Sequence, residues 1–250
     1  HCMDFNAPST FSHGNGSIFF KFAGQQNLRD TNNTARTFYE LTVDKSAGNT
    51  LQFIQDKGFD ITVAGALTIT SGTLVMSDLT SNVSRNFTVT GSSRISGTCT
   101  PGTTSTITLN GTTDVGGTFG GNSAWTLDLN ASLDASPGTL SCPNASGSFT
   151  FSGATWKTPT TLTTNSGMIT FDLAGTTTLG NASTQFNAVT VNNGATVNTS
   201  AASSYALTWA GACSVSGTIT PNASVITGNG AVTVNNGGVL GGKSGWMGAF

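Results

Sequence analysis

The feature that most constrains this chain is a three-residue pattern, apolar then Thr then apolar, which returns about every twenty residues. The triads are Leu41-Thr42-Val43, Ile61-Thr62-Val63, Phe87-Thr88-Val89, Ile107-Thr108-Leu109, Leu127-Asp128-Leu129, Phe149-Thr150-Phe151, Ile169-Thr170-Phe171, Val189-Thr190-Val191, Leu207-Thr208-Trp209 and Val232-Thr233-Val234. Their centres are 20, 26, 20, 20, 22, 20, 20, 18 and 25 residues apart, and Phe20-Lys21-Phe22 extends the series backwards. A period kept over this length predicts a repeat protein.

Each triad reads as a short β-strand. Successive strand side chains point to opposite faces, so the two apolar flanks share the inner face and the central Thr points outward. A second apolar position follows seven residues after the centre, as at Ile69, Ile95 and Val115, and corners such as Pro101-Gly102 separate the strands of the repeat. Two or three short strands in every repeat are typical of a coil of a β-solenoid.

We therefore expect an all-β, single-chain parallel β-helix of about ten coils with roughly 20 residues each, and right-handed crossovers. A β-sandwich is the alternative, but it does not require one triad at a constant phase. The position before the triad centre should form a continuous inner ladder. Its members would be Phe87, Ile107, Leu127, Phe149, Ile169, Val189 and Leu207.

The two ends differ from the repeat. Residues 1–17 lack the triad and are expected to form an extension or cap, and residues 18–240 are expected to form the solenoid domain. Residues 241–250 form an apolar tail with Trp246, Met247 and Phe250, which we expect either to cap the solenoid or to dock on a partner.

Charge is sparse, and this excludes several classes of function. The chain has 9 Lys and Arg against 11 Asp and Glu, and no charged side chain lies between Leu173 and Gly242. Binding to nucleic acid or to acidic lipid therefore lacks its usual electrostatic basis. No apolar run is long enough for a membrane-spanning helix, so membrane insertion is not expected.

The cysteines do not indicate a metal site or a disulfide framework. Cys2, Cys99, Cys142 and Cys213 lie far apart and have no metal-binding spacing. The last three fall at different phases of the repeat, which favours isolated buried thiols over disulfides. The two histidines, His1 and His13, have no second ligand placed by spacing, so neither a metal nor a cofactor is expected.

Part of the sequence resembles a known family. The run from Phe11 to Phe22, FSHGNGSIFFKF, is followed by Gly24-Gln25-Gln26 and by TFYELTV from Thr37 to Val43, and LTITSGTL spans Leu67 to Leu74. These segments are similar to the units of bacterial and bacteriophage β-strand-repeat proteins, closely over the first third of the chain and by pattern beyond it. The resemblance implies a solenoid in an extracellular or phage-particle setting, and it carries no catalytic residue to transfer.

One set of side chains could carry chemistry. Arg94, Asp114, Asp134 and Trp156 each lie six residues after a triad centre, so they should stack on the outer face of successive coils. Two stacked carboxylates about 5 Å apart would match a retaining glycosidase. A solvated ladder in which Arg94 offsets one Asp explains the same pattern without catalysis. We prefer the ladder, and Asp114, Asp134 and Arg94 are the catalytic candidates only if the chain is an enzyme, which would be a polysaccharide lyase or hydrolase.

A candidate binding face is the outward Thr column, with Trp156 beside it. Thr88, Thr108, Thr150 and Thr170 belong to this column, and a regular array of this kind could bind ice or a glycan. Asp128 interrupts the column, and β propensity alone also selects outward Thr. The sequence thus favours a non-enzymatic structural or adhesive solenoid, extracellular, at a cell surface or in a virion, whose partners are other protein subunits and, as a further option, glycans.

Overall fold

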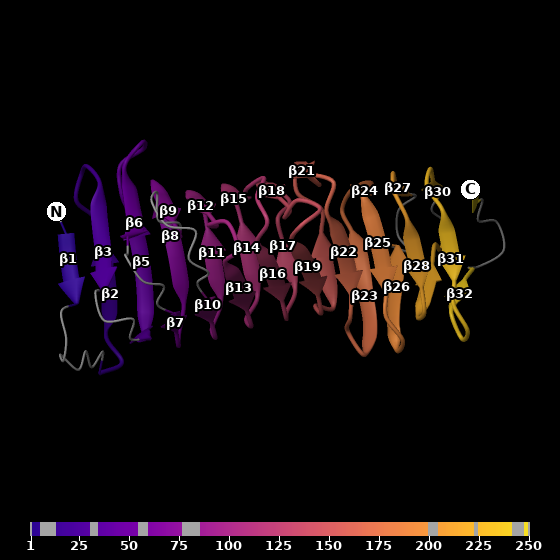
Figure 1. Ribbon diagram of the computed structural model, residues 1–250, viewed down its shortest axis with the longest axis horizontal. Coiled ribbons are helices and arrows are strands. Elements are labelled where there is room, and N and C mark those ends of the chain that lie inside the picture. The colour runs from indigo at the N-terminus through magenta and orange to yellow at the C-terminus, as the bar shows by residue number, and fades with distance from the viewer. Residues whose placement is uncertain are drawn as a thin grey trace.

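The chain folds into a single stack of parallel β-coils, seen side on in the computed structural model of Figure 1. The structure describes residues 2–5, 14–30, 35–54, 60–76, 86–199, 205–222, 225–241 and 248–249, and the described residues contain no helix. There are about nine turns of about 22 residues each. The predicted all-β parallel solenoid is confirmed.

From residue 36 to residue 163, each coil passes through three sheets in the same order, and we name these sheets C, B and A in that order. Sheet C contains β4 (Arg36–Phe38), β7 (Ile61–Val63), β10 (Asn86–Val89), β13 (Thr106–Leu109), β16 (Thr126–Leu129), β19 (Ser148–Phe151), β22 (Met168–Phe171), β25 (Ala188–Val191), β28 (Cys213–Val215) and β31 (Val232–Val234). Sheet B contains β2 (Ser17–Phe20), β5 (Glu40–Asp44), β8 (Leu67–Ser71), β11 (Ser93–Ile95), β14 (Thr113–Val115), β17 (Leu133–Asp134), β20 (Thr155–Lys157), β23 (Gly175–Gly180), β26 (Ala195–Thr199), β29 (Thr218–Thr220) and β32 (Val239–Leu240).

The third side of the coil changes partway along the stack. Sheet A contains β1 (Cys2–Phe5), β3 (Gln26–Asp30), β6 (Thr50–Ile54), β9 (Thr73–Val75), β12 (Thr98–Thr100), β15 (Thr118–Gly120), β18 (Thr139–Ser141) and β21 (Thr161–Thr163). A fourth sheet, D, takes over this side with β24 (Thr184–Phe186), β27 (Leu207–Trp209), β30 (Ile226–Gly228) and β33 (Gly248–Ala249).

The switch from sheet A to sheet D reflects the position of β24 relative to the preceding coil. The hydroxyl of Thr184 is 2.5 Å from that of Thr158, so β24 lies over the corner that precedes β21 and not over β21 itself. Aromatic rings fill the core at this level. Trp156 makes edge contacts with Phe151 and Phe186, at centroid distances of 5.3 and 5.5 Å. Such contacts add to the hydrophobic stabilisation of the core.

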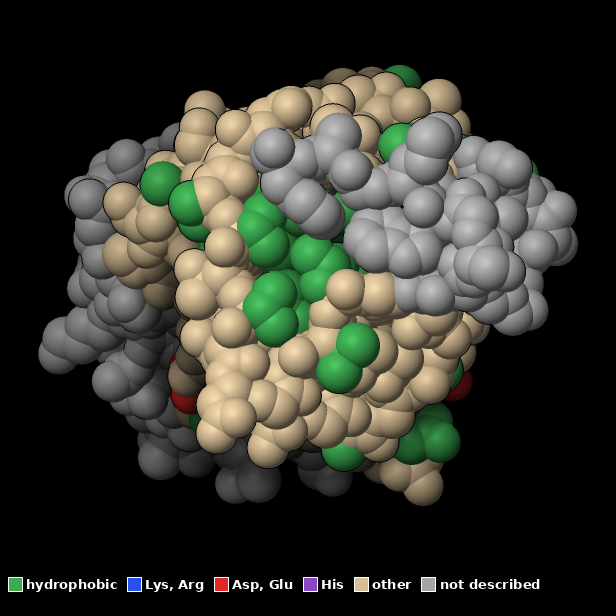
Figure 2. Space-filling model, turned by 90° about the vertical axis from the view of Figure 1, so that its right-hand side faces the viewer, with side chains coloured by type: hydrophobic (Ala, Val, Ile, Leu, Met, Phe, Trp, Pro, Cys, Tyr) green, Lys and Arg blue, Asp and Glu red, His purple; other side chains and the backbone are tan. Residues whose placement is uncertain are grey.

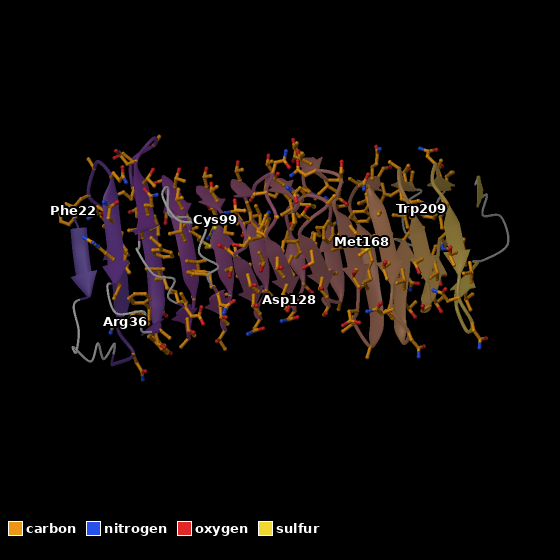
Figure 3. All side chains as sticks on the ribbon, viewed as in Figure 1. Phe22, Arg36, Cys99, Asp128, Met168 and Trp209 are labelled. Atoms are coloured by element: carbon orange, nitrogen blue, oxygen red, sulfur yellow. The ribbon has the colours of Figure 1, made fainter. Side chains whose placement is uncertain are left out.

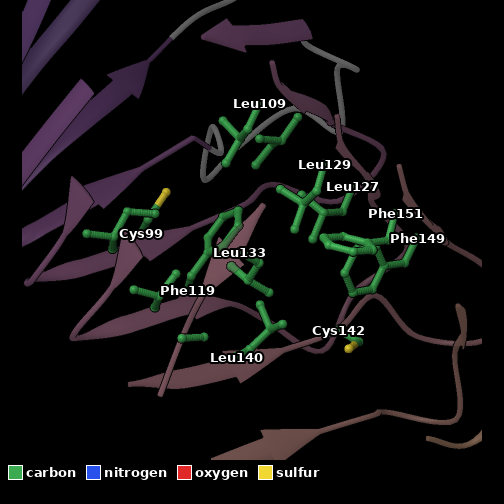
Figure 4. Packing of buried hydrophobic residues seen from close by; sticks show 14 of the residues in the cluster. Cys99, Leu109, Phe119, Leu127, Leu129, Leu133, Leu140, Cys142, Phe149 and Phe151 are labelled. Atoms are coloured by element: carbon green, nitrogen blue, oxygen red, sulfur yellow. The ribbon is translucent and has the colours of Figure 1, made fainter. Parts of the chain in front are cut away.

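The inner ladder of sheet C is confirmed from Phe87 to Val189. Phe87, Ile107 and Leu127 are register partners, and Phe149, Ile169 and Val189 continue the column. Side chains of this column pack against inner residues of the other sheets, as Figure 4 shows around Leu127 and Phe149. Because each inner face is covered only by its neighbours in the stack, stability accumulates from coil to coil.

The ends of the predicted ladder and triad series are wrong. Val189 pairs with Cys213, whereas Leu207 lies in sheet D. The triad Leu207-Thr208-Trp209 forms the third side of its coil and not the sheet C side. Leu41-Thr42-Val43 lies in sheet B, paired with Leu67-Thr68-Ile69. Phe20 is buried at the end of β2, but Phe22 is 71 % exposed, so Phe20-Lys21-Phe22 is not a triad (Figure 3).

Glycines allow the coils to approach closely at the corner between sheets B and A. A Cβ atom on Gly117 would lie 2.0 Å from the carbonyl oxygen of Gly97 in the coil below. Only glycine fits such an approach. At the β31 and β32 end of the stack, apolar side chains are exposed, with Val234 47 % and Val239 50 % accessible (Figure 2).

Candidate functional site

The candidate site is a column of charged side chains on the outer face of sheet B. Arg94 is the register partner of Asp114, Asp114 of Asp134, and Asp134 of Lys157. The predicted stacking of Arg94, Asp114 and Asp134 on successive coils is therefore confirmed. Neighbouring strands in such a sheet lie about 4.8 Å apart. The structure thus brings two carboxylates together between two cationic side chains.

Trp156 does not continue this column, and the prediction that it lies on the outer face is wrong. Its side chain is fully buried, and Leu133 is its register partner. The corner after the triad centre Thr150 is one residue longer than the corner after Asp128, so Lys157 takes the outer position. A shift of one residue moves a strand side chain to the opposite face.

The charges in the column form two ion pairs. Arg94 Nε lies 3.8 Å from Asp114 Oδ2, and Lys157 Nζ lies 2.5 Å from Asp134 Oδ2. The other carboxylate oxygen of Asp134 accepts hydrogen bonds from the hydroxyl and the backbone N–H of Ser136, at 2.8 and 3.2 Å. The hydrogen bond from Lys157 holds the pKa of Asp134 below its usual value, and the bonds from Ser136 act in the same direction.

The column lines a shallow depression of about 520 Å³. Besides the four charged residues, hydroxyl side chains line it, and among them Ser92 and Thr112 are exposed at the corner before the strand. The charged side chains stay in contact with water, with accessibilities between 38 % for Asp134 and 71 % for Arg94. The depression is therefore open to water, and its four charges sum to zero.

The ionised state of Asp134 limits the role it could take in a retaining glycosidase. That mechanism needs one protonated carboxyl group as the acid and one ionised carboxylate as the nucleophile. The low pKa of Asp134 keeps its carboxylate ionised, and Lys157 and Ser136 donate hydrogen bonds to its oxygens. Asp134 is thus suited to accept hydrogen bonds but not to donate a proton.

The outward Thr column on sheet C is also present. Thr88, Thr108, Thr150 and Thr170 lie on the outer face in register, and Asp128 interrupts them as expected. Burial and the charge of Asp172 raise the pKa of Asp128 (Figure 3). A second outward column runs two residues earlier along the same strands. It contains Asn86, Thr106, Thr126, Ser148, Met168 and Ala188.

The triad pattern did not predict a second Thr column, which is unbroken and runs along sheet A. In six successive coils the same register position is Thr. The members are Thr50, Thr73, Thr98, Thr118, Thr139 and Thr161. The signal that could have found them is a Thr one residue before each apolar side chain of the third strand, as in Thr139-Leu140 and Thr161-Leu162.

Three of the cysteines are buried free thiols, in agreement with the prediction. Burial raises the pKa of Cys99 and Cys142 to about 12 and that of Cys213 to about 11, so none of these thiols is a ready nucleophile. The side chain of Cys2 lies outside the described residues, as do His1, His13 and the predicted docking residues Trp246, Met247 and Phe250. Within the described parts of the chain, no three His, Cys, Asp or Glu side chains cluster as metal ligands would.

No protein-family model, curated protein or solved structure matches this chain. Over the described ranges there is no helix with the length and hydrophobicity needed to cross a membrane.

Proposed function

We propose that this chain is a non-enzymatic structural and adhesive β-solenoid of an extracellular surface, a fibre or a phage particle. The observation that carries the proposal is the unbroken core, which joins buried apolar side chains from Phe20 in β2 to Ile226 in β30. The inner position of nearly every strand serves stacking, and the product is a stiff rod that holds regular outer faces and corner loops in place. Such a rod presents binding surfaces at fixed positions.

The ion pairs support a role in binding over a role in catalysis. Asp134, one of the catalytic candidates, is held ionised by Lys157, and Arg94 lies beside Asp114. The buried cysteine thiols have raised pKa values and add no nucleophile. Other subunits of a surface or virion assembly are the partners that a rod of this kind would serve.

The test is to locate the native protein. Antibodies raised against the purified chain are used for immunogold electron microscopy of the source cells and of particles released from them. We expect label on the cell surface, on filaments or on virions. Label confined to the cytoplasm would overturn the proposal, as would turnover of a polysaccharide by the purified chain.

A glycan-active enzyme is the second candidate, and the depression around Asp114 and Asp134 favours it. Incubation with polyuronates and with mixed neutral glycans, followed by chromatography of the products, tests this activity. Asp114→Asn and Asp134→Asn are the controls, since a reaction at this site must be lost in both variants.

An ice-binding module is the third candidate, and the six-coil Thr column on sheet A favours it. Thermal hysteresis of the purified protein tests this directly. Thr118→Lys places a charged side chain in the middle of the column and should abolish any hysteresis, whereas Thr170→Lys on sheet C should leave it unchanged if sheet A is the ice-binding face.

A further inference from the structure

Charge is concentrated in one column of an otherwise nearly uncharged surface. Between Asn86 and Gly242 the sequence contains only six charged side chains. Four of these stack on consecutive strands of sheet B, between β11 and β20. The six are Arg94, Asp114, Asp128, Asp134, Lys157 and Asp172.

The fold does not need this column for stability. Exposed ion pairs contribute about 0 to 1 kcal/mol, and all four side chains are more than a third accessible. Asp114 lies directly opposite Asp134 on the neighbouring strand, and like charges in this position are unfavourable. The equivalent outer positions of sheets A and C hold mostly Thr. A column that adds little stability and includes a repulsive pair is best explained by binding.

The chemistry of the depression indicates an uncharged ligand rich in hydroxyl groups. Arg94 and Lys157 can donate hydrogen bonds at the two ends of the column, and the carboxylates of Asp114 and Asp134 can accept them in the middle. The exposed hydroxyls of Ser92 and Thr112 can do both. Because the two carboxylates adjoin each other, an anionic polymer would be repelled at the centre of the site, and a cationic one would be repelled at its ends.

The geometry points to a linear polymer. The polar groups recur on successive strands at about 4.8 Å along the solenoid axis, which is close to the length of one sugar ring in an extended chain. The depression is shallow and open, so it can hold several rings without enclosing either end of the polymer. We propose that the outer face of sheet B between β11 and β20 binds a linear, uncharged polysaccharide whose chain runs along the solenoid axis.

In this site the hydroxyl groups of successive sugars donate to Asp114 and Asp134 and accept from Arg94 and Lys157. The proposal rests on the adhesive function proposed above, and it assigns that function a ligand class and a location. It also gives a role to Lys157, which orients Asp134 through a 2.5 Å hydrogen bond and leaves its remaining N–H groups for the ligand.

The experiment is a binding measurement with defined hexasaccharides. Cellohexaose, chitohexaose, mannohexaose and maltohexaose are the neutral probes, and hexagalacturonate is the anionic comparison. We expect the purified full chain to bind at least one neutral probe with a Kd of about 1 mM or tighter by isothermal titration calorimetry. The anionic probe should bind more weakly than that neutral probe.

Variants place the binding on sheet B. Asp114→Asn combined with Asp134→Asn keeps the shape of the side chains but removes both negative charges, and we expect affinity to fall about tenfold or more. Lys157→Gln should also weaken binding. Asp172→Asn, which removes an exposed charge outside the depression, is the matched control and should bind as the wild type does. Thermal unfolding of each variant shows that the fold is kept.

The outcomes separate this proposal from the proposed function. Failure of every neutral probe to bind, preference for the anionic probe, or unchanged affinity in the double Asp variant would each overturn the glycan site and leave the scaffold proposal standing. Cleavage of a bound probe, seen by chromatography, would overturn the non-enzymatic function while still placing a glycan in the depression.

Discussion

Substitution of Leu127 by Asp is the sharpest test of how the sequence is divided between the inside and the outside of the solenoid. Leu127 is fully buried on β16, with Ile107 and Phe149 as its register partners on the neighbouring coils. Its side chain therefore packs above, below and across the core. Any polar atom placed there meets no water and no hydrogen-bonding partner from the apolar column.

The expected magnitude has two parts. Truncation to Ala removes the buried methyl groups and leaves a cavity, which costs about 3 kcal/mol at a site of this kind. The carboxyl group of Asp adds the penalty of an unpaired buried polar group, about 2 kcal/mol or more. Leu127→Asp should thus lower the free energy of unfolding by about 5 kcal/mol, which is close to the whole stability of many domains.

The assay is urea unfolding followed by tryptophan fluorescence, since Trp125 and Trp156 are both buried in this part of the core. Thr170→Asp is the matched control, because Thr170 is half-buried on the outer face and the change should cost about 0.5 kcal/mol. Leu127→Ala keeps the test usable if the Asp variant fails to fold. Equal losses for Leu127→Asp and Thr170→Asp would refute the assignment of inner and outer faces.

Substitutions at Gly117, Lys45 and Lys157 test three particular contacts. Gly117→Ala should lower the free energy of unfolding by about 2 kcal/mol or more in the urea unfolding assay, because the new Cβ would meet the carbonyl oxygen of Gly97 at 2.0 Å. Gly116→Ala is the matched control and should be nearly silent, since a Cβ at that position meets nothing closer than 3.9 Å. Burial lowers the pKa of Lys45. Between that lowered pKa and about 10.5, the side chain is protonated in the unfolded chain but not in the folded one, so the free energy of unfolding should rise with pH in this range. Lys45→Met should lack this rise, and equal pH profiles for the two proteins would contradict the prediction. The pKa of Asp134, measured by NMR, should lie below 3.8 and should rise toward that value in Lys157→Met, because the hydrogen bond from Lys157 is the main cause of the low pKa. An unchanged pKa in the variant would show that the ion pair is not the cause.

The period of the sequence predicted the parallel solenoid because the inner position must be apolar in every coil. The same requirement made the stacking of Arg94, Asp114 and Asp134 predictable, since three successive corners have equal length. Lys157 was missed because one additional residue in the next corner reverses the face of Trp156. Corner length is a local property that the triad period does not record.

The change from sheet A to sheet D could not be predicted from the triads. Leu207-Thr208-Trp209 has the same pattern as a sheet C strand, yet it lies on the third side of its coil. The pattern specifies only that two apolar residues flank an outward residue, and every side of the solenoid satisfies that condition. Long-range stacking, as between Thr158 and Thr184, decides which side a given triad occupies.

The proposed binding site requires that the coils stack in the register that gathers Arg94, Asp114, Asp134 and Lys157 into one column. Disulfide formation between introduced cysteines measures this register directly. Neighbouring strands place partner Cα atoms about 4.8 Å apart, within the range of about 4.4 to 6.8 Å that a disulfide spans. In a Cys2→Ser background, where Cys99, Cys142 and Cys213 are buried, we expect Asp134→Cys with Lys157→Cys to form a disulfide under mild oxidation, detected by mass spectrometry. Asp134→Cys with Thr155→Cys should form it far less readily. The reverse preference would contradict the register, and with it the column on which the proposed binding site depends.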